Sequence, residues 1–162
     1  MSSGRPQEVV DYIVENVLRP NMTDINDKRA SRKGSGYNWI YSDLPRATND
    51  MPRIGVEFDS GGAVPEAIGS LNVRQRPVIQ VQVKMTQGNK YDIDNDGNKE
   101  KTEDCIDYLE DRVIKLIKAH HDDIVDNCPA EYVRFTNDNR QNPPDDGFIY
   151  QNAIFETMIT RG

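Results

Sequence analysis

Residues 77–85 alternate strictly between apolar and polar side chains, and this run constrains the fold more than any other segment. The apolar members are Ile79, Val81, Val83 and Met85, and the polar members between them are Gln80, Gln82 and Lys84. Because successive side chains of a strand point to opposite faces, this alternation predicts a strand with one buried face and one wet face. A sheet of this kind needs a covering layer on only one side.

Two other segments have the periodicity of helices, and four have the character of strands. In the helical segments, apolar residues recur at three- and four-residue spacing, which makes one buried face of a helix. Apolar and β-branched residues bounded by turn residues indicate the strands. The expected helices span residues 7–18 and 102–121, and the expected strands span residues 37–41, 54–58, 131–136 and 148–160.

The order of these elements predicts an α+β fold in a single domain, residues 1–162. Consecutive strands joined by short links favour a mostly antiparallel sheet, and we expect both helices to pack on one face of it. Two connections are longer than folding requires: a polar loop over residues 21–50 and a hairpin tip over residues 137–147. Such connections usually have a function or are partly disordered, so both are candidate contact elements.

The chain is acidic, with 27 Asp and Glu against 20 Lys and Arg and a formal net charge of −7. This charge disfavours a broad nucleic-acid-binding face, because carboxylates repel phosphates. It suits a passage along which DNA slides without sticking. A basic cluster within residues 28–33, followed by Tyr37 and Trp39, is compatible with contact to a neighbouring subunit, contact to nucleic acid, or a plain solvated loop.

No apolar run approaches the roughly 18–20 residues of a membrane span, and the first residues lack the apolar core of a secretory signal. We therefore expect a soluble protein without a membrane segment. Cys105 and Cys128 permit one disulfide, and two reduced thiols in a cytosolic product are the favoured alternative.

An acidic run over residues 92–103 has the spacing of oxygen ligands around a cation. It resembles the calcium loop of EF-hand and dockerin-type proteins, with acids at alternate positions and a glycine at the sharp turn. The resemblance implies a backbone carbonyl ligand at Asn98, a water-mediated contact from Glu100 and two closing oxygens from Glu103. The ligand set that it implies is Asp92, Asp94, Asp96, Asn98 and Glu103.

The acidic run departs from those calcium loops in two respects. Lys99 stands where the families place an aliphatic residue, and the preceding segment is expected to be a strand rather than a helix. The resemblance therefore implies a calcium site without an EF-hand fold. The alternative is a solvated acidic turn in which Glu103 stabilises the start of the following helix through the helix dipole.

A second constellation concerns nuclease chemistry. Glu57 and Asp59, followed on the next strand by Gln82 and Lys84, loosely resemble the core of PD-(D/E)xK nucleases. That chemistry needs acids that hold magnesium beside a lysine that orients the attacking water. The simpler interpretation is that Gln82 and Lys84 belong to the wet face of the alternating strand.

Other signs of catalysis are missing from the sequence. His120 and His121 are adjacent, and neighbouring helical residues point about 100° apart, so one metal ion cannot bind both on a regular helix. No nucleophile motif and no phosphate-binding glycine loop is present. Because little remains from which to build acid–base catalysis, the sequence favours a structural role and not an enzyme.

The whole order of elements resembles the tail-completion and tail-terminator proteins of tailed viruses, the neck proteins that join the head to the tail. The features that carry this resemblance are the helix 7–18, the proline-punctuated stretch 44–53, the strand 77–85, the helix 102–121 and a closing strand 150–157. The acidic loop is not part of that family pattern. The acidity of the chain would fit a virus of a haloarchaeal host.

The neck-protein resemblance implies a homo-oligomeric ring, commonly a hexamer, between the head connector and the tail tube of the virion, assembled in the host cytoplasm. DNA would pass through an acidic lumen without specific binding. Each subunit would add its sheet edge or its long loop to the next subunit. Two alternatives stay open: a calcium-stabilised binding module outside viruses and a magnesium-dependent nuclease.

Overall fold

Strand β5, Val78–Thr86, runs through the middle of the sheet and confirms the strand predicted over residues 77–85. Its second face is not wet as predicted, because Gln82 and Lys84 are buried. The four apolar residues of the alternation are at most 1 % exposed. The computed structural model describes residues 6–26, 39–42, 51–59, 63–65, 73–75, 77–94, 96–143 and 147–161. Side-chain statements exclude residues 59, 63–65, 73–75, 160 and 161.

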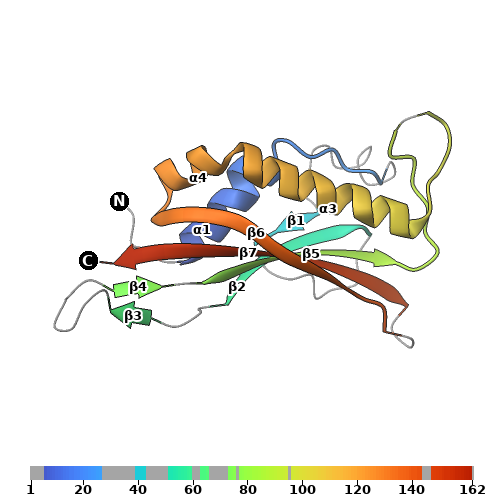
Figure 1. The fold of residues 1–162 in the computed structure, drawn as a ribbon. Coiled ribbons are helices and arrows are strands. Elements are labelled where there is room, and N and C mark those ends of the chain that lie inside the picture. Colours follow the sequence, from blue (N-terminus) through green and yellow to red (C-terminus); the bar gives the residue numbers. More distant parts are fainter. Residues whose placement is uncertain are drawn as a thin grey trace.

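In the described part of the chain the sheet has seven strands, and six of them follow the order β1-β2-β5-β7-β4-β3 (Figure 1). Strands β5 and β4 pair with one edge of β7, and β6 pairs with its other edge. All of its pairings are antiparallel except that of β1 with β2. A mostly antiparallel α+β fold is therefore confirmed. The other strands are β1 Ile40–Tyr41, β2 Arg53–Asp59, β3 Ala63–Pro65, β4 Val73–Gln75, β6 Ala130–Gln141 and β7 Phe148–Arg161.

In the described residues, three helical segments cover one face of this sheet (Figure 1). The two predicted helices lie on one face as expected, and the short helix α4 is additional. Helix α1, Pro6–Tyr12, continues as a π-helical turn over Ile13–Leu18, which the N–H of Arg19 closes by donating to the carbonyl of Val14 at 3.0 Å. Helix α3, Thr102–Ala119, is followed by the short helix α4, His121–Asn127. None of the helices in the described residues is both long and apolar enough to cross a bilayer.

The core lies between the helix layer and the inward face of the sheet. The π-helical turn, α3 and β5 each contribute residues that are fully buried, such as Ile13, Leu109 and Ile79. Trp39, which precedes β1, is also fully buried, and these residues belong to one continuous apolar cluster. Burial of such side chains is the main favourable term in folding, at roughly 1.5–3 kcal/mol each.

Several boundaries differ from the prediction. Residues 137–141, expected in the hairpin tip, belong to β6 and pair with β7. Their polar side chains have low intrinsic strand propensity, but the pairing with β7 and contacts to α3 hold them extended.

Strands β3 and β4 are three residues long and gave no periodic signal. Helix α4 extends the helical region beyond residue 121. Most of the predicted 21–50 loop lies outside the described residues.

Candidate functional site

The acidic loop between β5 and α3 is closed at its base by backbone hydrogen bonds. The N–H of Glu100 donates to the carbonyl of Tyr91 at 2.8 Å, and the N–H of Tyr91 donates back at 3.3 Å. The hydroxyl of Thr102 donates to the carbonyl of Asn89 at 2.5 Å, and the thiol of Cys105 lies 3.7 Å from the carbonyl of Tyr91. These bonds fix both ends of the loop to the first turn of α3.

Inside the loop, carboxylates accept backbone hydrogen bonds. Asp92 accepts from the N–H of Gly97 at 2.8 Å and from the N–H of Asp96 at 3.2 Å. Asp96 accepts from the N–H of Asn98 at 2.9 Å. Gly97 has a φ of +88°, a conformation that L side chains rarely adopt, so the glycine permits the sharp turn.

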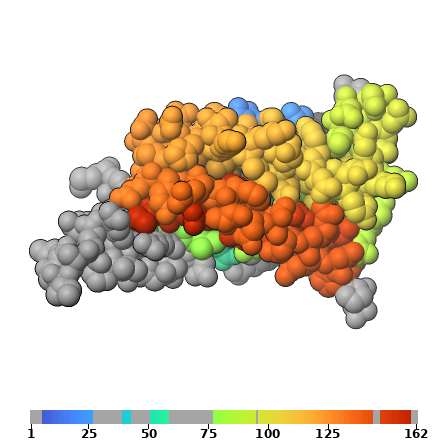
Figure 2. All heavy atoms as spheres, in the orientation of Figure 1, coloured from blue at the N-terminus to red at the C-terminus, as the bar shows by residue number. Residues whose placement is uncertain are grey.

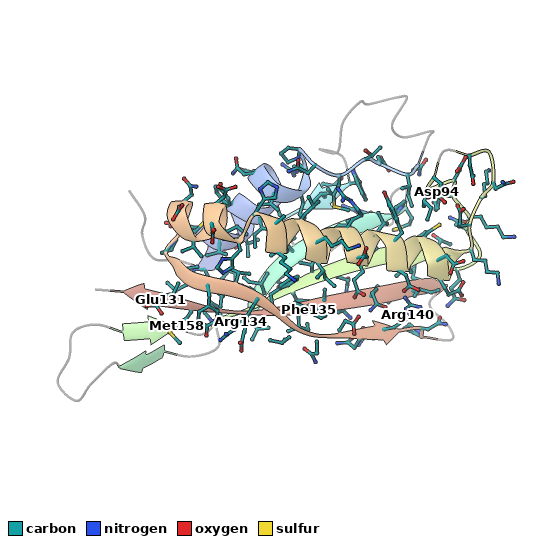
Figure 3. All side chains as sticks on the ribbon, turned by 45° about the horizontal axis from the view of Figure 1, so that its top comes forward. Asp94, Glu131, Arg134, Phe135, Arg140 and Met158 are labelled. Atoms are coloured by element: carbon teal, nitrogen blue, oxygen red, sulfur yellow. The ribbon has the colours of Figure 1, made fainter. Side chains whose placement is uncertain are left out.

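Three carboxylates gather at this loop. Asp94, Asp96 and Glu100 each offer an oxygen, and these oxygens lie within 4.8 Å of one another. Asp94 and Asp96 are exposed, and Glu100 is half-buried and accepts from the N–H of Ile93 at 3.3 Å. Figure 3 shows Asp94 on the loop at one end of the molecule, away from the sheet. The acidic cluster is therefore an acceptor-only group of oxygens open to solvent.

The structure places the five residues of the implied ligand set in different environments. Asp94 and Asp96 lie in the cluster, while the carboxylate of Asp92 faces the backbone N–H groups of the turn. Asn98 is exposed, and Glu103 is exposed on the first turn of α3, outside the group of three. Glu100 takes part because its backbone pairing with Tyr91 fixes its position, a tertiary feature that loop spacing does not reveal.

The acidic cluster has the chemistry of a hard-cation site. Calcium takes 6–8 oxygen ligands at about 2.3–2.6 Å, so two ligands of one ion lie at most about 5 Å apart. The spread of 4.8 Å among the three carboxylate oxygens fits that limit. Three negative charges so close together repel one another, and a bound cation would offset this repulsion.

The nuclease-like residues do not come together. Glu57 on β2 lies opposite Gln80 on β5, whereas Lys84 lies opposite Arg53. The offset of four residues along an antiparallel strand corresponds to a separation of roughly 13 Å, too far for one metal-bound water to contact both groups. Asp59 lies opposite Val78, which is two residues further from Lys84 along β5 than Gln80 is.

The other residues singled out by sequence have local partners. Nδ1 of His120 lies 3.3 Å from Asp123, and Nδ1 of His121 lies 3.2 Å from Asp122, so each imidazole faces a different carboxylate. Cys105 and Cys128 are free thiols, and burial is the main cause that raises the pKa of each. The basic cluster within residues 28–33 lies outside the described residues.

A groove runs between α3 and the edge strand β6, and sequence reasoning did not find it. Its volume is about 560 Å³, and it is lined by Ile114 and Ile117 of α3 and by Val133, Phe135 and Phe155 of the sheet. Phe135 is 41 % exposed, and its ring packs edge-on against that of Phe155, with centroids 5.7 Å apart. Figure 2 shows β6 as an uncovered orange band across the front of the molecule, next to the helix layer.

A polar seam joins the N-terminal half of α3 to the β6–β7 hairpin. Glu110 of α3 accepts a hydrogen bond from the side-chain amide of Gln151 at 2.7 Å. Burial raises the pKa of Glu110 to about 7, with further increases from a hydrogen bond with Asp138 and from the charges of Asp138 and Asp107. Arg140 donates to both Gln151 and Asp107. The seam thus holds a carboxyl group that titrates near neutral pH.

Comparison with known proteins adds no relative: the chain matches no family model, and no curated protein sequence matches it significantly. The class of molecule is therefore defined by its own fold and surfaces. It is an α+β domain with one helix-covered sheet face, an open edge strand beside an apolar groove, and a cluster of three carboxylates at one end.

Proposed function

We propose that this chain is a structural, non-catalytic neck protein of a tailed virus. In this role, copies of the chain form a ring, commonly a hexamer, that joins the head connector to the tail tube and lets DNA pass. The observation that carries the proposal is the open edge of β6 beside the apolar groove. This edge gives the chain a surface that a neighbouring copy could cover.

Strand β6 supplies an extended contact surface. It is 12 residues long and pairs with β7 alone among the described strands, so its outer backbone groups have no partner strand. Its side chains are exposed from Arg134 to Gln141. An edge of this length is normally paired or covered, and a closed ring of subunits is one way to cover it. Phe135 would add apolar area to such a contact.

The charge of the chain supports the passage of DNA. With a net charge of −7, a ring of identical subunits would present many carboxylates to its lumen. A lumen with this charge repels the phosphate backbone and prevents adhesion of the DNA. The same charge opposes the packing of copies at low salt, so ring formation should strengthen as salt screens the repulsion.

The proposed ring is tested by measuring the molar mass of the purified protein by light scattering, at low and high salt, with negative-stain images of the same samples. We expect a discrete oligomer near six subunits that appears as rings. Phe135→Ser should reduce its mass, because it removes an exposed ring from the contact surface. Lys115→Ser, which changes an exposed residue of α3 outside the groove, is the matched control. A monomer at every concentration up to near-millimolar would contradict the ring.

For the acidic cluster we propose calcium as the bound ion, held by Asp94, Asp96 and Glu100 with help from neighbouring oxygens of the loop. Calcium would neutralise the carboxylates and fix the start of α3. The alternative function as a calcium-stabilised binding module outside viruses shares this site. The two functions predict different molar masses, because the neck protein forms a ring and the binding module is a monomer. The melting temperature of the binding module rises with calcium.

Calcium binding is tested by melting curves recorded with calcium and with chelator. A ligand that binds only the folded state at 100 times its Kd stabilises it by about 2.7 kcal/mol, which corresponds to a rise in Tm of roughly 5–10 °C for a domain of this size. Asp94→Asn should abolish most of that rise. Asp126→Asn, an exposed acid on α4, should leave it intact. An equal response in the two variants would refute the site.

A further inference from the structure

A bulge in β6 turns two charged side chains toward α3. The register with β7 shifts by one residue just after Phe135, so Thr136 is an extra residue in the strand. Because side chains of a strand alternate between its two faces, the shift puts Asp138 and Arg140 on the same helix-covered face as Phe135. Asp138 accordingly lies opposite the buried Ala153 of β7.

The part of β6 beyond the bulge has no apolar side chain that could pack on α3. We call this part, residues 136–141, distal β6, and its side chains are those of Thr, Asn, Asp, Asn, Arg and Gln. Upstream of the bulge, Val133 and Phe135 line an apolar groove together with residues of α3. Polar contacts, and not burial of apolar area, therefore attach distal β6 to α3, and such contacts respond to charge.

The polar seam makes this attachment. Arg140 donates to Asp107 of α3 and, at 2.6 Å, to Oε1 of Gln151 (Figure 3). Nε2 of Gln151 donates to Glu110 at 2.7 Å and lies 3.4 Å from Asp138. Glu110 and Asp138 also share a hydrogen bond. Two carboxyl groups can hydrogen-bond to each other only when one of them carries a proton, so a proton links α3 directly to distal β6.

The charges around Glu110 favour its protonated form. Among the α3 residues three and four positions away, only Asp107 is charged. Strand β6 brings Asp138 and Arg140, β7 brings the uncharged Gln151, and the residue of β5 opposite Gln151 is apolar. With Glu110 ionised, three carboxylates would therefore face one guanidinium. Burial is the largest cause that raises the pKa of Glu110 to about 7, and Asp138 and Asp107 raise it further.

We propose that the seam is a proton-dependent latch between α3 and distal β6. When Glu110 is protonated, it donates to Asp138 and the latch is closed. When Glu110 is ionised, its charge repels Asp138 and distal β6 separates from α3, while β7 stays in the sheet through its pairing with β5. The latch belongs to the single chain and does not depend on the proposed ring.

The direction of the pH response follows from the pKa of Glu110 in the two states. In the open latch the carboxyl is solvated and has its ordinary pKa of 4.5, and in the closed latch its pKa is about 7. The closed latch is therefore most stable below about pH 4.5, loosens as pH rises to about 7, and changes no further above that. Solvent screens the half-buried carboxyl, so we expect opening to increase about fivefold between pH 5.5 and pH 8.5.

The latch is tested by hydrogen exchange of backbone amides at pH 5.5 and pH 8.5. Protection factors are compared, because they correct for the intrinsic rise of exchange with pH. Among residues 138–141, the protected amides of the wild type should lose about fivefold in protection at the higher pH. Glutamine donates to Asp138 and accepts from Gln151 at every pH, so Glu110→Gln should show no such loss. Equal losses in the two proteins would overturn the latch.

Two controls separate the latch from a general loss of stability. The amides of residues 130–135, upstream of the bulge, should keep their protection at both pH values, and an equal loss along all of β6 would overturn the proposal. Asp126→Asn removes an exposed acid on α4 and should show the same loss as the wild type.

If Glu110→Gln does not fold, an NMR titration of the wild type replaces it. The side-chain carboxyl of Glu110 and the backbone amide of Asp138 should shift with one common midpoint near pH 7. A carboxyl that titrates near its ordinary pKa of 4.5 would overturn the proposal.

The latch has a consequence for the contact edge of β6, and this consequence rests on the proposed ring. Opening of distal β6 removes part of the ordered edge that a neighbouring copy would cover. At constant salt, the oligomer mass of the wild type should therefore fall between pH 5.5 and pH 8.5, and that of Glu110→Gln should not. A wild type that is monomeric at both pH values contradicts the ring, whereas unchanged amide protection contradicts the latch, so the two failures are distinct.

Discussion

At the residue scale, Glu110 combines burial with two acidic neighbours on different elements. Asp107 is on the same helix, Asp138 comes from β6, and Arg140 of β6 and Gln151 of β7 complete its surroundings. Its folded-state pKa of about 7 is above the ordinary value of 4.5. Stability from this group is therefore fully present below about pH 4.5 and is lost as pH rises through 7.

We therefore predict that Glu110→Gln stabilises the protein above neutral pH and not at pH 5. Glutamine imitates the protonated acid at every pH, so it removes the penalty of ionising Glu110 beside Asp138. Because the carboxyl is only half-buried, solvent screening limits the gain to about 1 kcal/mol, or roughly 3 °C in Tm. The measurement is Tm from pH 5 to pH 9 for Glu110→Gln, the wild type and Asp126→Asn.

Asp126→Asn serves as the control for Glu110→Gln because Asp126 is an exposed acid on α4. Its curve should run parallel to that of the wild type across the whole pH range. The assignment fails if Glu110→Gln and the wild type also run parallel, since the carboxyl would then not titrate near neutral pH in the folded protein.

At the element scale, the acidic loop depends on a turn that only glycine makes without strain. Gly97 and Gly88 both have positive φ, of +88° and +84°, and an added Cβ would meet no atom within 4 Å at either position. A substitution would therefore strain the backbone at either glycine, but the two glycines lie in different turns. Gly97 is inside the acidic loop, whereas Gly88 is in the turn that follows β5.

We predict that Gly97→Ala and Gly88→Ala lower Tm in chelator by similar amounts, about 2–6 °C, because each forces a left-handed backbone conformation on alanine. Only Gly97→Ala should also weaken the rise in Tm with calcium, because it disturbs the backbone that aims Asp96. Calcium titrations of both variants, followed by melting curves, measure this difference. If both variants respond equally to calcium, the turn at Gly97 does not contribute to ion binding.

The elements also show which parts of the fold are readable from sequence. The alternation of β5 has a period of two and a buried face, so its position was predicted to within one residue at either end. Residues 137–141 were missed because their strand state depends on distant partners. Arg140 donates to Gln151 at 2.6 Å, and the amide of Asn152 donates to Asn139 at 3.0 Å. Polar strands of this kind have no local signal.

The sequence predicted only part of the acidic cluster, because spacing along the chain gives only local information. Spacing within the chain points to Asp94 and Asp96, which the structure brings together with Glu100. Spacing does not reveal the role of Asp92, whose carboxylate accepts the N–H groups of the turn. Nor does the sequence locate the groove beside Phe135, because it forms where α3 meets strands β6 and β7.

At the scale of the whole molecule, the distinct surfaces lie on different sides. The acidic cluster is at one end, and the groove lies along the open edge of β6. A subunit with separate, unlike surfaces can contact two neighbours head to tail, and a repeated contact of that kind closes into a ring when the rotation permits. The arrangement is therefore compatible with the proposed neck protein.

The position of β7 in the sheet has a consequence for how the chain folds. It pairs with β5 on one side and β6 on the other, and Gln82 of β5 and Asn152 of β7 are separated by 70 residues. Until β7 is in place, β5 has only β2 as a neighbour, and β6 has none among the described strands. Loop closure over such a distance must precede most of the stabilising pairing, which makes folding slow. While the chain is still being synthesised, the edge of β5 that pairs with β7 would lack this partner strand until β7 leaves the ribosome.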